Sequence, residues 1–279
     1  MQSLPSLFLS HGAPTTAIDP GTTGAMFSRL GRQLPRPRAI VVVSAHHMTT
    51  VPEVGTAPRP DTIYDFSGFP PALYQLKYPA LGAADVSERV AALLGEADID
   101  VRMNPNRGLD HGAWVPLLYL FPDADIPVVP LSIQPRMDAH HHFAVGRAIA
   151  SLRDEGALVV GSGNLTHNLR DIQRWERDAG TTPYVTAFQT WFAEHLAVRD
   201  IDALLDWAHQ APHAARAHPT DDHLLPMFVA LGAAGTSPAT LRLHADVTYG
   251  VLAMDAFAFG DAGADFDAFG ILAAKPEDS

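Results

Sequence analysis

Histidines follow apolar segments at several points along the chain, where their side chains could meet. His46 comes shortly after the apolar run 40–43, and His11 follows the shorter run 7–9. His167 follows a third apolar run through a glycine-containing turn. Uninterrupted apolar runs are typical of strands buried on both faces of an α/β sheet, and such sheets gather reactive groups at the carboxyl ends of their strands. Imidazoles at one sheet edge would bind a metal ion or exchange protons with a substrate.

Two further histidines have comparable settings. His111 follows a turn that contains Gly108, and His223 opens a predicted helix that has Thr220 as its N-cap. One such histidine would more often be a hydrogen-bonded strand-end residue, but the repetition favours a shared site. Imidazole suits iron, zinc, copper and nickel alike, so the ligand type does not name the metal. Metal ligands beside acid–base histidines fit oxygen activation or metal-assisted hydrolysis.

The other histidines have ordinary interpretations. The run 140–142 lies at a predicted helix start, where a solvated capping cluster is expected because consecutive helical residues do not share one face. His47 must point away from its neighbour in extended chain, so we expect a supporting or surface role for it. His218 lies in a proline-containing loop close to His223 and resembles a site residue only by position.

Composition limits the classes of function. The formal net charge of −12 argues against a nucleic-acid surface and against a polybasic membrane anchor. The chain has no cysteine, so thiolate chemistry, disulfides and cysteine-ligated metals are excluded. No signal-type or membrane-spanning apolar segment is evident, so we expect a cytoplasmic protein that acts on small molecules.

The elements that must position these histidines predict an α/β fold. We expect a single catalytic domain over 1–279, with a central mixed β-sheet flanked by helices on both faces and a loose tail at 260–279. The prolines of strand 126–132 favour an edge or irregular position. Loop 51–72 carries three aromatics close together, which favours an ordered active-site loop. The predicted helices are 24–34, 86–94, 115–121, 138–154, 183–199 and 200–210, and 241–259 is expected to form two strands.

At this point the chain resembles the DOPA-dioxygenase type of class III extradiol ring-cleaving dioxygenases, which are relatives of the protocatechuate 4,5-dioxygenase catalytic subunit. Six motifs in the expected order carry the resemblance. They are LSHGAP at 9–14, VSAH at 43–46, YDFSGFP at 64–70, LDHGAW at 109–114, GSGNLTHN at 161–168 and DHLLP at 222–226.

The resemblance implies a mononuclear metal held by His11, His46 and His223. His167 is then the active-site base or a fourth ligand, and His111 is the second proton-transfer histidine. The implied reaction inserts both atoms of O2 into a DOPA-like or other small catechol to give a muconic semialdehyde. It requires Fe²⁺, with Zn²⁺ as an alternative occupant.

Loop 64–71 would shape the substrate pocket with Tyr64, Phe66 and Phe69. Arg107, Arg136 and Arg170 are candidates for binding a substrate carboxylate, although each is more typical of a surface ion pair.

Two other functions use the same residues. A zinc hydrolase would use a metal-bound water as nucleophile and His167 as base. A non-catalytic relative of the Memo type would keep the fold without the reaction. The sequence does not set the oligomeric state, so a homo-oligomer is left open.

Overall fold

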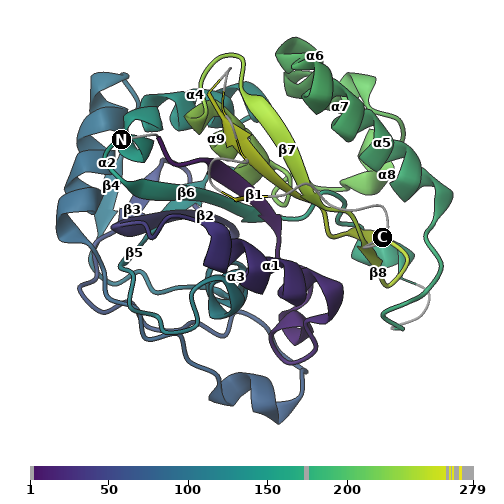
Figure 1. The fold of residues 1–279 in the computed structure, drawn as a ribbon, viewed down its shortest axis with the longest axis horizontal. Helices are drawn as coiled ribbons and strands as arrows, with labels where there is room; N and C mark the ends of the chain where they lie inside the picture. The colour runs from purple at the N-terminus through teal and green to yellow at the C-terminus, as the bar shows by residue number, and fades with distance from the viewer. Residues whose placement is uncertain (1–2, 173–175, 262–263, 265, 267–269, 272–279) are drawn as a thin grey trace.

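The structure is a computed structural model that describes residues 3–172, 176–261, 264, 266, 270 and 271 (Figure 1). Its main sheet has the strand order β4-β3-β5-β2-β6-β1-β10-β7. The bounds in that order are Arg102–Asn104, Glu53–Gly55, Val128–Ile133, Ala39–Met48, Ala157–Gly163, Ser6–Ser10, Ala256–Gly260 and Ala239–His244. The strands β5, β2, β6 and β1 are parallel, whereas β10 runs antiparallel to β1 and to β7. The predicted mixed sheet is therefore confirmed.

The apolar run of β2 faces both sides of the sheet in alternation. Ile40 and Val42 pack into the core beneath α1 (Gly21–Gln33) and α3 (His111–Leu120). Their neighbours Val41 and Val43 pack on the opposite face, whose core includes residues of α2 (Ala84–Glu96), α4 (Ala139–Ala148) and α9 (Leu225–Ala233). Both faces of the strand are buried, which explains the lack of polar alternation and confirms helices on both faces (Figure 1).

A third core joins the last part of the sheet to a group of helices. Phe257 and Phe259 of β10 belong to the same buried cluster as Phe188 and Phe192 of α5 (Pro183–Val198). The short helices α6 (Ile201–Leu205), α7 (Trp207–Gln210) and α8 (Ala214–Ala217) complete this group. The remaining short elements are the hairpin β8 (Val247–Thr248) with β9 (Leu252–Ala253), and the 3-10 helices η1 (Pro14–Ala17), η2 (Pro71–Gln75), η3 (Ala150–Arg153) and η4 (Leu169–Asp171).

Several expected elements differ from the structure. The range 241–259, expected to form two strands, contains parts of β7 and β10 with the hairpin β8–β9 between them, and the helix expected over 200–210 is divided into α6 and α7. The strand β5 is not at an edge, because β3 lies beyond it, but the other expectation, an irregular position, fits: β3 meets β5 at the single pair Val54–Leu131 and so requires few backbone N–H donors from this proline-containing strand. The predicted N-cap at Thr220 is wrong. The helix begins at Leu225, with Pro226 in its first turn where a missing N–H is tolerated. His223 consequently lies in the turn before α9.

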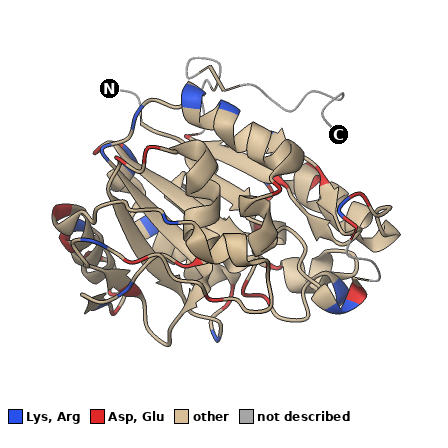
Figure 2. Ribbon diagram, turned by 90° about the horizontal axis from the view of Figure 1, so that it is seen from below, with Lys and Arg blue, Asp and Glu red and all other residues tan. Residues whose placement is uncertain are grey.

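Two features of the structure concern charge and hydropathy: the placement of the basic residues and the apolar character of the helices. Lysine and arginine residues are dispersed along the described ribbon (Figure 2). Among the described residues, no helix is both long and apolar enough to span a membrane. Most of the predicted tail at 260–279 lies outside the described residues.

Candidate metal and proton-transfer site

Five predicted histidines lie together at one edge of the sheet. His11 follows β1 and His46 lies near the end of β2, and their ring centroids are 5.0 Å apart. The ring of His223 lies 5.5 Å from that of His11 and 4.9 Å from that of His46. His111, the first residue of α3, is 4.0 Å from His46, and His167 is 3.4 Å from His223.

A glycine at the end of β6 allows these segments to meet. The Gly163 carbonyl accepts the backbone N–H of His11 at 2.9 Å. A Cβ built on Gly163 would lie 1.9 Å from the carbonyl oxygen of His223, which is far inside van der Waals contact. The next residue, Asn164, donates its N–H to that same carbonyl at 2.9 Å. The turn that carries His223 therefore packs directly against β6 because residue 163 has no side chain.

A serine fixes the tautomer of His11. The Ser162 hydroxyl donates to the carbonyl of Gly112, so its oxygen is left to accept from His11 Nδ1, 3.0 Å away. His11 then carries its proton on Nδ1 and presents an unprotonated Nε2. This nitrogen lies 3.1 Å from Nε2 of His46.

An aspartate orients His223 in the same way. Asp222 accepts a hydrogen bond from His223 Nδ1, which leaves Nε2 as the free nitrogen. That Nε2 atom is buried and has no hydrogen-bond partner among the described residues. A buried polar atom without a partner is costly unless something outside the chain satisfies it.

The donor set fits a metal ion. One ligand nitrogen each from His11, His46 and His223 can be chosen so that all lie within 4.8 Å of one another. His11 and His46 face each other through their Nε2 atoms at 3.1 Å, and His223 offers its orphaned Nε2. Lone pairs directed at a common point repel one another, and a cation there would convert the repulsion into bonds. Metal-bound histidines commonly donate their other N–H to a carboxylate or hydroxyl, as His223 and His11 do here.

Burial keeps these imidazoles neutral. Desolvation, followed by the neighbouring histidines, places the pKa of His11 and that of His223 well below the ordinary value. Burial is also the main cause that lowers the pKa of His46 to about 4 and the pKa of His167 to about 4. At neutral pH all four rings therefore have a lone pair available for a metal or a proton.

His167 lies against one candidate ligand, with its ring centroid 3.4 Å from that of His223. The two rings are stacked with planes 9° apart. Its backbone N–H donates to the carbonyl of Ala217 at 2.9 Å. His218 donates through Nε2 to the Leu165 carbonyl at 2.8 Å and so supports the same turn. His218 is thus a structural neighbour of the site, as expected from its position.

His111 is held at the start of α3 by two aspartates. Asp110 is the N-cap, and its side chain accepts the N–H of Ala113 at 3.2 Å. Asp65 accepts the backbone N–H of His111 at 2.9 Å and its ring Nδ1 at 2.8 Å. Burial would raise the pKa of Asp65, but the hydrogen bonds from the ring and the backbone N–H of His111 outweigh it and hold the pKa at about 2. Asp65 is therefore a carboxylate at neutral pH.

The aromatic loop lies on the His111 side of the cluster. The Phe66 ring meets the His111 ring edge-on at 5.6 Å, and Phe69 packs on Phe66 at 5.4 Å. The hydroxyl of Tyr64 donates to the carbonyl of Leu76 at 2.6 Å, so this group is engaged in holding the loop. Of the three predicted substrate contacts, Phe66 lies nearest to the histidines.

The structure also tests the expectations for His47, for the cluster 140–142 and for Arg107. His47 does point away from the site, but it is buried and pairs with Glu53 at 3.0 Å. His142 is also buried, so the expected solvated cluster at 140–142 is wrong for this residue, whose Nε2 accepts the N–H of Gln134. Arg107 forms an ion pair with Asp110, which engages it within the protein.

Sequence reasoning did not identify the groups that orient the rings. Ser162, Asp222 and Asp65 were not assigned roles, although all three lie in the motifs around the histidines. The sequence feature that could have identified them is a hydroxyl or carboxylate side chain inside a motif that also contains a candidate ligand or an aromatic residue of the loop.

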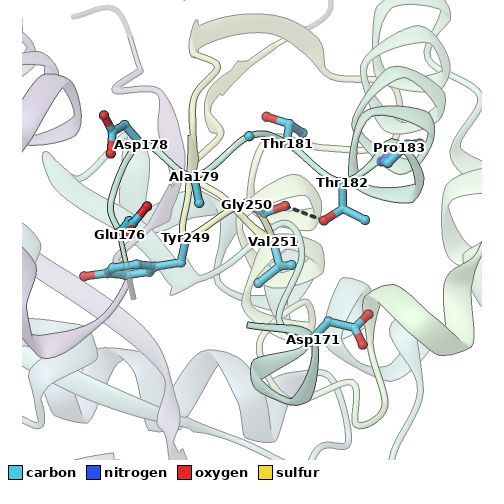
Figure 3. A pocket seen from close by; sticks show the side chains of 11 residues that line it. Asp171, Glu176, Asp178, Ala179, Thr181, Thr182, Pro183, Tyr249, Gly250 and Val251 are labelled. Carbon is cyan, nitrogen blue, oxygen red and sulfur yellow. Dashed lines mark hydrogen bonds between the residues drawn. The ribbon is translucent and has the colours of Figure 1, made fainter. Parts of the chain in front are cut away.

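A separate pocket of about 610 Å³ lies beside the segment 249–251 (Figure 3). Its lining includes the acidic residues Asp171, Glu176 and Asp178, and it contains none of the five histidines. Val251, which also lines it, accepts a hydrogen bond from Thr166 at 2.7 Å, so the pocket and the His167 turn share a wall.

Comparisons with known proteins place the chain in a family. A family profile described as the catalytic LigB subunit of aromatic ring-opening dioxygenase matches residues 5–258. A Beta vulgaris protein named 4,5-DOPA dioxygenase extradiol is 38% identical over 91% of this chain and 96% of its own length. The protein of that name from Escherichia coli K12 is 40% identical over 86% of this chain and 89% of its own. A crystal structure of an uncharacterized Escherichia coli K12 protein aligns with a TM-score of 0.75 at 33% identity, covering 92% of this chain and all of the other.

Proposed function

The chain belongs to the family of catalytic LigB subunits of aromatic ring-opening dioxygenases, and from this membership we propose that it opens the ring of a small catechol with O2. The named relatives make a DOPA-like catechol the first candidate substrate. In the proposed reaction both atoms of O2 enter one product, a muconic semialdehyde. One oxygen ends in the new carboxylate and the other in the aldehyde, and the ring supplies all the electrons that O2 accepts.

The convergence of three imidazole side chains carries this proposal. His11, His46 and His223 would hold the metal through their ring nitrogens. Ser162 and Asp222 hold the protons of His11 and His223 on the opposite ring atoms. Ferrous iron, when bound there, would supply the one-electron chemistry that lets O2 react with a catechol. Zinc fits the same nitrogen ligands but does not change oxidation state.

The remaining histidines would move protons. His167 has a pKa lowered to about 4 by burial, so it is neutral at physiological pH and able to accept a proton from a catechol hydroxyl. His111, held on the opposite side of the cluster, would donate a proton to the oxygen atom that separates when the O–O bond is cleaved. Proton transfer by a positioned group contributes roughly 10²- to 10⁴-fold to a rate.

The aromatic loop would bound the substrate pocket. Phe66 lies against His111, and an aromatic wall there would stack with a catechol ring and exclude water. Phe69 supports Phe66, whereas Tyr64 contributes mainly by holding the loop through Leu76. We propose that residues 1–279 act as one catalytic domain, and the cytoplasmic location stays a prediction.

Oxygen uptake by metal-stripped protein reloaded anaerobically with Fe²⁺ or Zn²⁺ tests the proposal. We expect iron-dependent uptake with at least one member of a catechol panel that includes DOPA, together with a yellow ring-opened product. Zinc-loaded protein should consume no O2. Zinc-dependent hydrolysis without O2 uptake would instead support the hydrolase. Inactivity with full iron occupancy would support the non-catalytic alternative. The names of the relatives favour neither of these two functions.

A further inference from the structure

Asp65 contacts the site at three places at once. One carboxylate oxygen, Oδ1, accepts the backbone N–H of His111, and the other, Oδ2, accepts its ring Nδ1. Oδ2 also lies 3.4 Å from Nδ1 of His46. The side chain is 21% exposed, so these contacts form where water competes only partly.

The two contacts with His111 need a carboxylate. Both N–H groups are donors, and each faces a different oxygen of Asp65. An asparagine of the same shape has only one acceptor oxygen, so one of the two donors would face an NH2 group. The backbone donor cannot change, whereas the ring can move its proton to Nε2. The first turn of α3 also favours a negative charge at this point.

Hydrogen bonds of the neighbouring residue Ile63 also connect the aromatic loop to α3. Ile63 donates its N–H to the carbonyl of Leu109 at 2.7 Å, and Trp114 of α3 donates through Nε1 to the carbonyl of Ile63 at 3.0 Å. Asp65 therefore lies in a segment already attached to the start of the helix. Its neighbour Phe66 forms the aromatic wall beside His111.

We propose that Asp65 is a positioning residue that holds the Nδ1 proton of His111 and thereby makes Nε2 the nitrogen that exchanges a proton with the substrate. Through its place between Tyr64 and Phe66 it also fixes the aromatic wall relative to that nitrogen. The assignment to the reaction rests on the proposed function, but the location of the His111 proton does not.

Nitrogen NMR on the full-length, zinc-loaded protein tests the proton location. Long-range ¹H–¹⁵N spectra distinguish a protonated ring nitrogen from an unprotonated one, and the His111 signals are assigned by their loss in His111→Gln. We expect wild-type His111 to carry a proton on Nδ1. In Asp65→Asn the proton should be on Nε2 alone, because the amide oxygen stays with the backbone donor. Asp61→Asn, which removes an exposed charge from the same loop, should leave the pattern unchanged.

Kinetics on the iron-loaded enzyme then test the role. We expect Asp65→Asn to lower kcat by about 10- to 100-fold, the usual effect of losing an orienting group, while KM for the catechol changes less than about threefold. Metal content at saturating and limiting metal should match wild type.

Three results would overturn the proposal. They are wild-type His111 protonated only on Nε2, Asp65→Asn with unchanged kcat, and Asp65→Asn with metal loss like that of a ligand variant. The last would make Asp65 a ligand, since His46, Asp65 and His111 also form a group able to hold a metal. The wild-type spectrum decides even if the variant does not fold. Absence of O2 uptake with all catechols would contradict the proposed function and leave the NMR result valid.

Discussion

The imidazole rings of His167 and His223 are stacked, with centroids 3.4 Å apart and planes 9° apart. An imidazole nitrogen binds a metal through a lone pair in the plane of its ring, at about 2 Å. Two nearly parallel planes separated by the thickness of a ring do not meet within such a bond length. If His223 is a ligand, this stacking places His167 beside the metal as a base and disfavours it as a fourth ligand.

His167→Ala should therefore keep the metal and lose turnover. Removing a proton-transfer group is expected to lower kcat by about 10²- to 10⁴-fold. Metal analysis after dialysis, together with O2 uptake on the same sample, checks both parts. Stoichiometric metal loss would make His167 a ligand.

His11→Ala, His46→Ala and His223→Ala should each lose metal. Loss of one of three protein ligands should weaken metal binding by more than the roughly 10- to 100-fold expected for an orienting neighbour. Competition with a chromophoric chelator measures the affinity. His209→Ala is the matched control, because this ring is 85% exposed and lies outside all six motifs. Wild-type affinity in any of the three variants would remove that residue from the proposed metal site.

Gly163→Ala should disturb the site through the backbone. The new methyl group would meet the carbonyl oxygen of His223 at 1.9 Å, so the turn before α9 must move. We expect unfolding to become easier by about 1–3 kcal/mol and metal binding to weaken.

Gly95→Ala should have the opposite effect on stability and is measured in the same experiment. Gly95 lies in α2 with no atom near its added methyl group, so alanine should stabilise the protein by about 0.5–1 kcal/mol. Urea unfolding of both variants checks the pair. Equal stability of Gly163→Ala and wild type would mean that the close packing of this turn is not required.

His142 should make the metal-free protein sensitive to acid. Its ring is fully buried, and burial lowers its pKa from 6.5 to about 4. The unfolded chain therefore binds more protons than the folded one between these values. Its contribution to stability is present above pH 6.5 and is lost as pH falls toward 4, with a slope of about 1.4 kcal/mol per pH unit.

Unfolding of wild type and His142→Gln across this pH range measures the effect. The variant should show a slope smaller by about one proton per molecule, whereas other buried histidines such as His47 and His218 contribute equally to both. Identical slopes would mean that His142 does not titrate differently in the two states.

The sequence was sufficient to predict the architecture and to find the five histidines. Apolar runs such as 40–43 report burial on both faces of a strand, and the motifs around the histidines come from segments that must meet at its end. Local sequence patterns were less reliable for helix boundaries that are set by tertiary packing. Thr220 resembles an N-cap, but Pro226 and the contact of His223 with Gly163 set the helix start at Leu225.

The partners that orient the rings could not be predicted from spacing. Ser162 accepts from His11 only because its hydroxyl is directed to Gly112 by the fold, and Asp65 reaches His111 across 46 positions of sequence. His142 resembled a solvated residue because its acceptor role depends on Gln134, which the end of β5 places beside it. Such contacts depend on three-dimensional geometry that residue types alone do not specify.

The most direct test of the central claim is the stoichiometry of O2 consumption by iron-loaded wild-type protein with a reactive catechol, measured beside His11→Ala. The three-histidine site predicts one O2 consumed per catechol opened, no hydrogen peroxide released, and no reaction in the variant. Consumption of O2 with release of peroxide and a quinone, or ring opening that persists in His11→Ala, would contradict it.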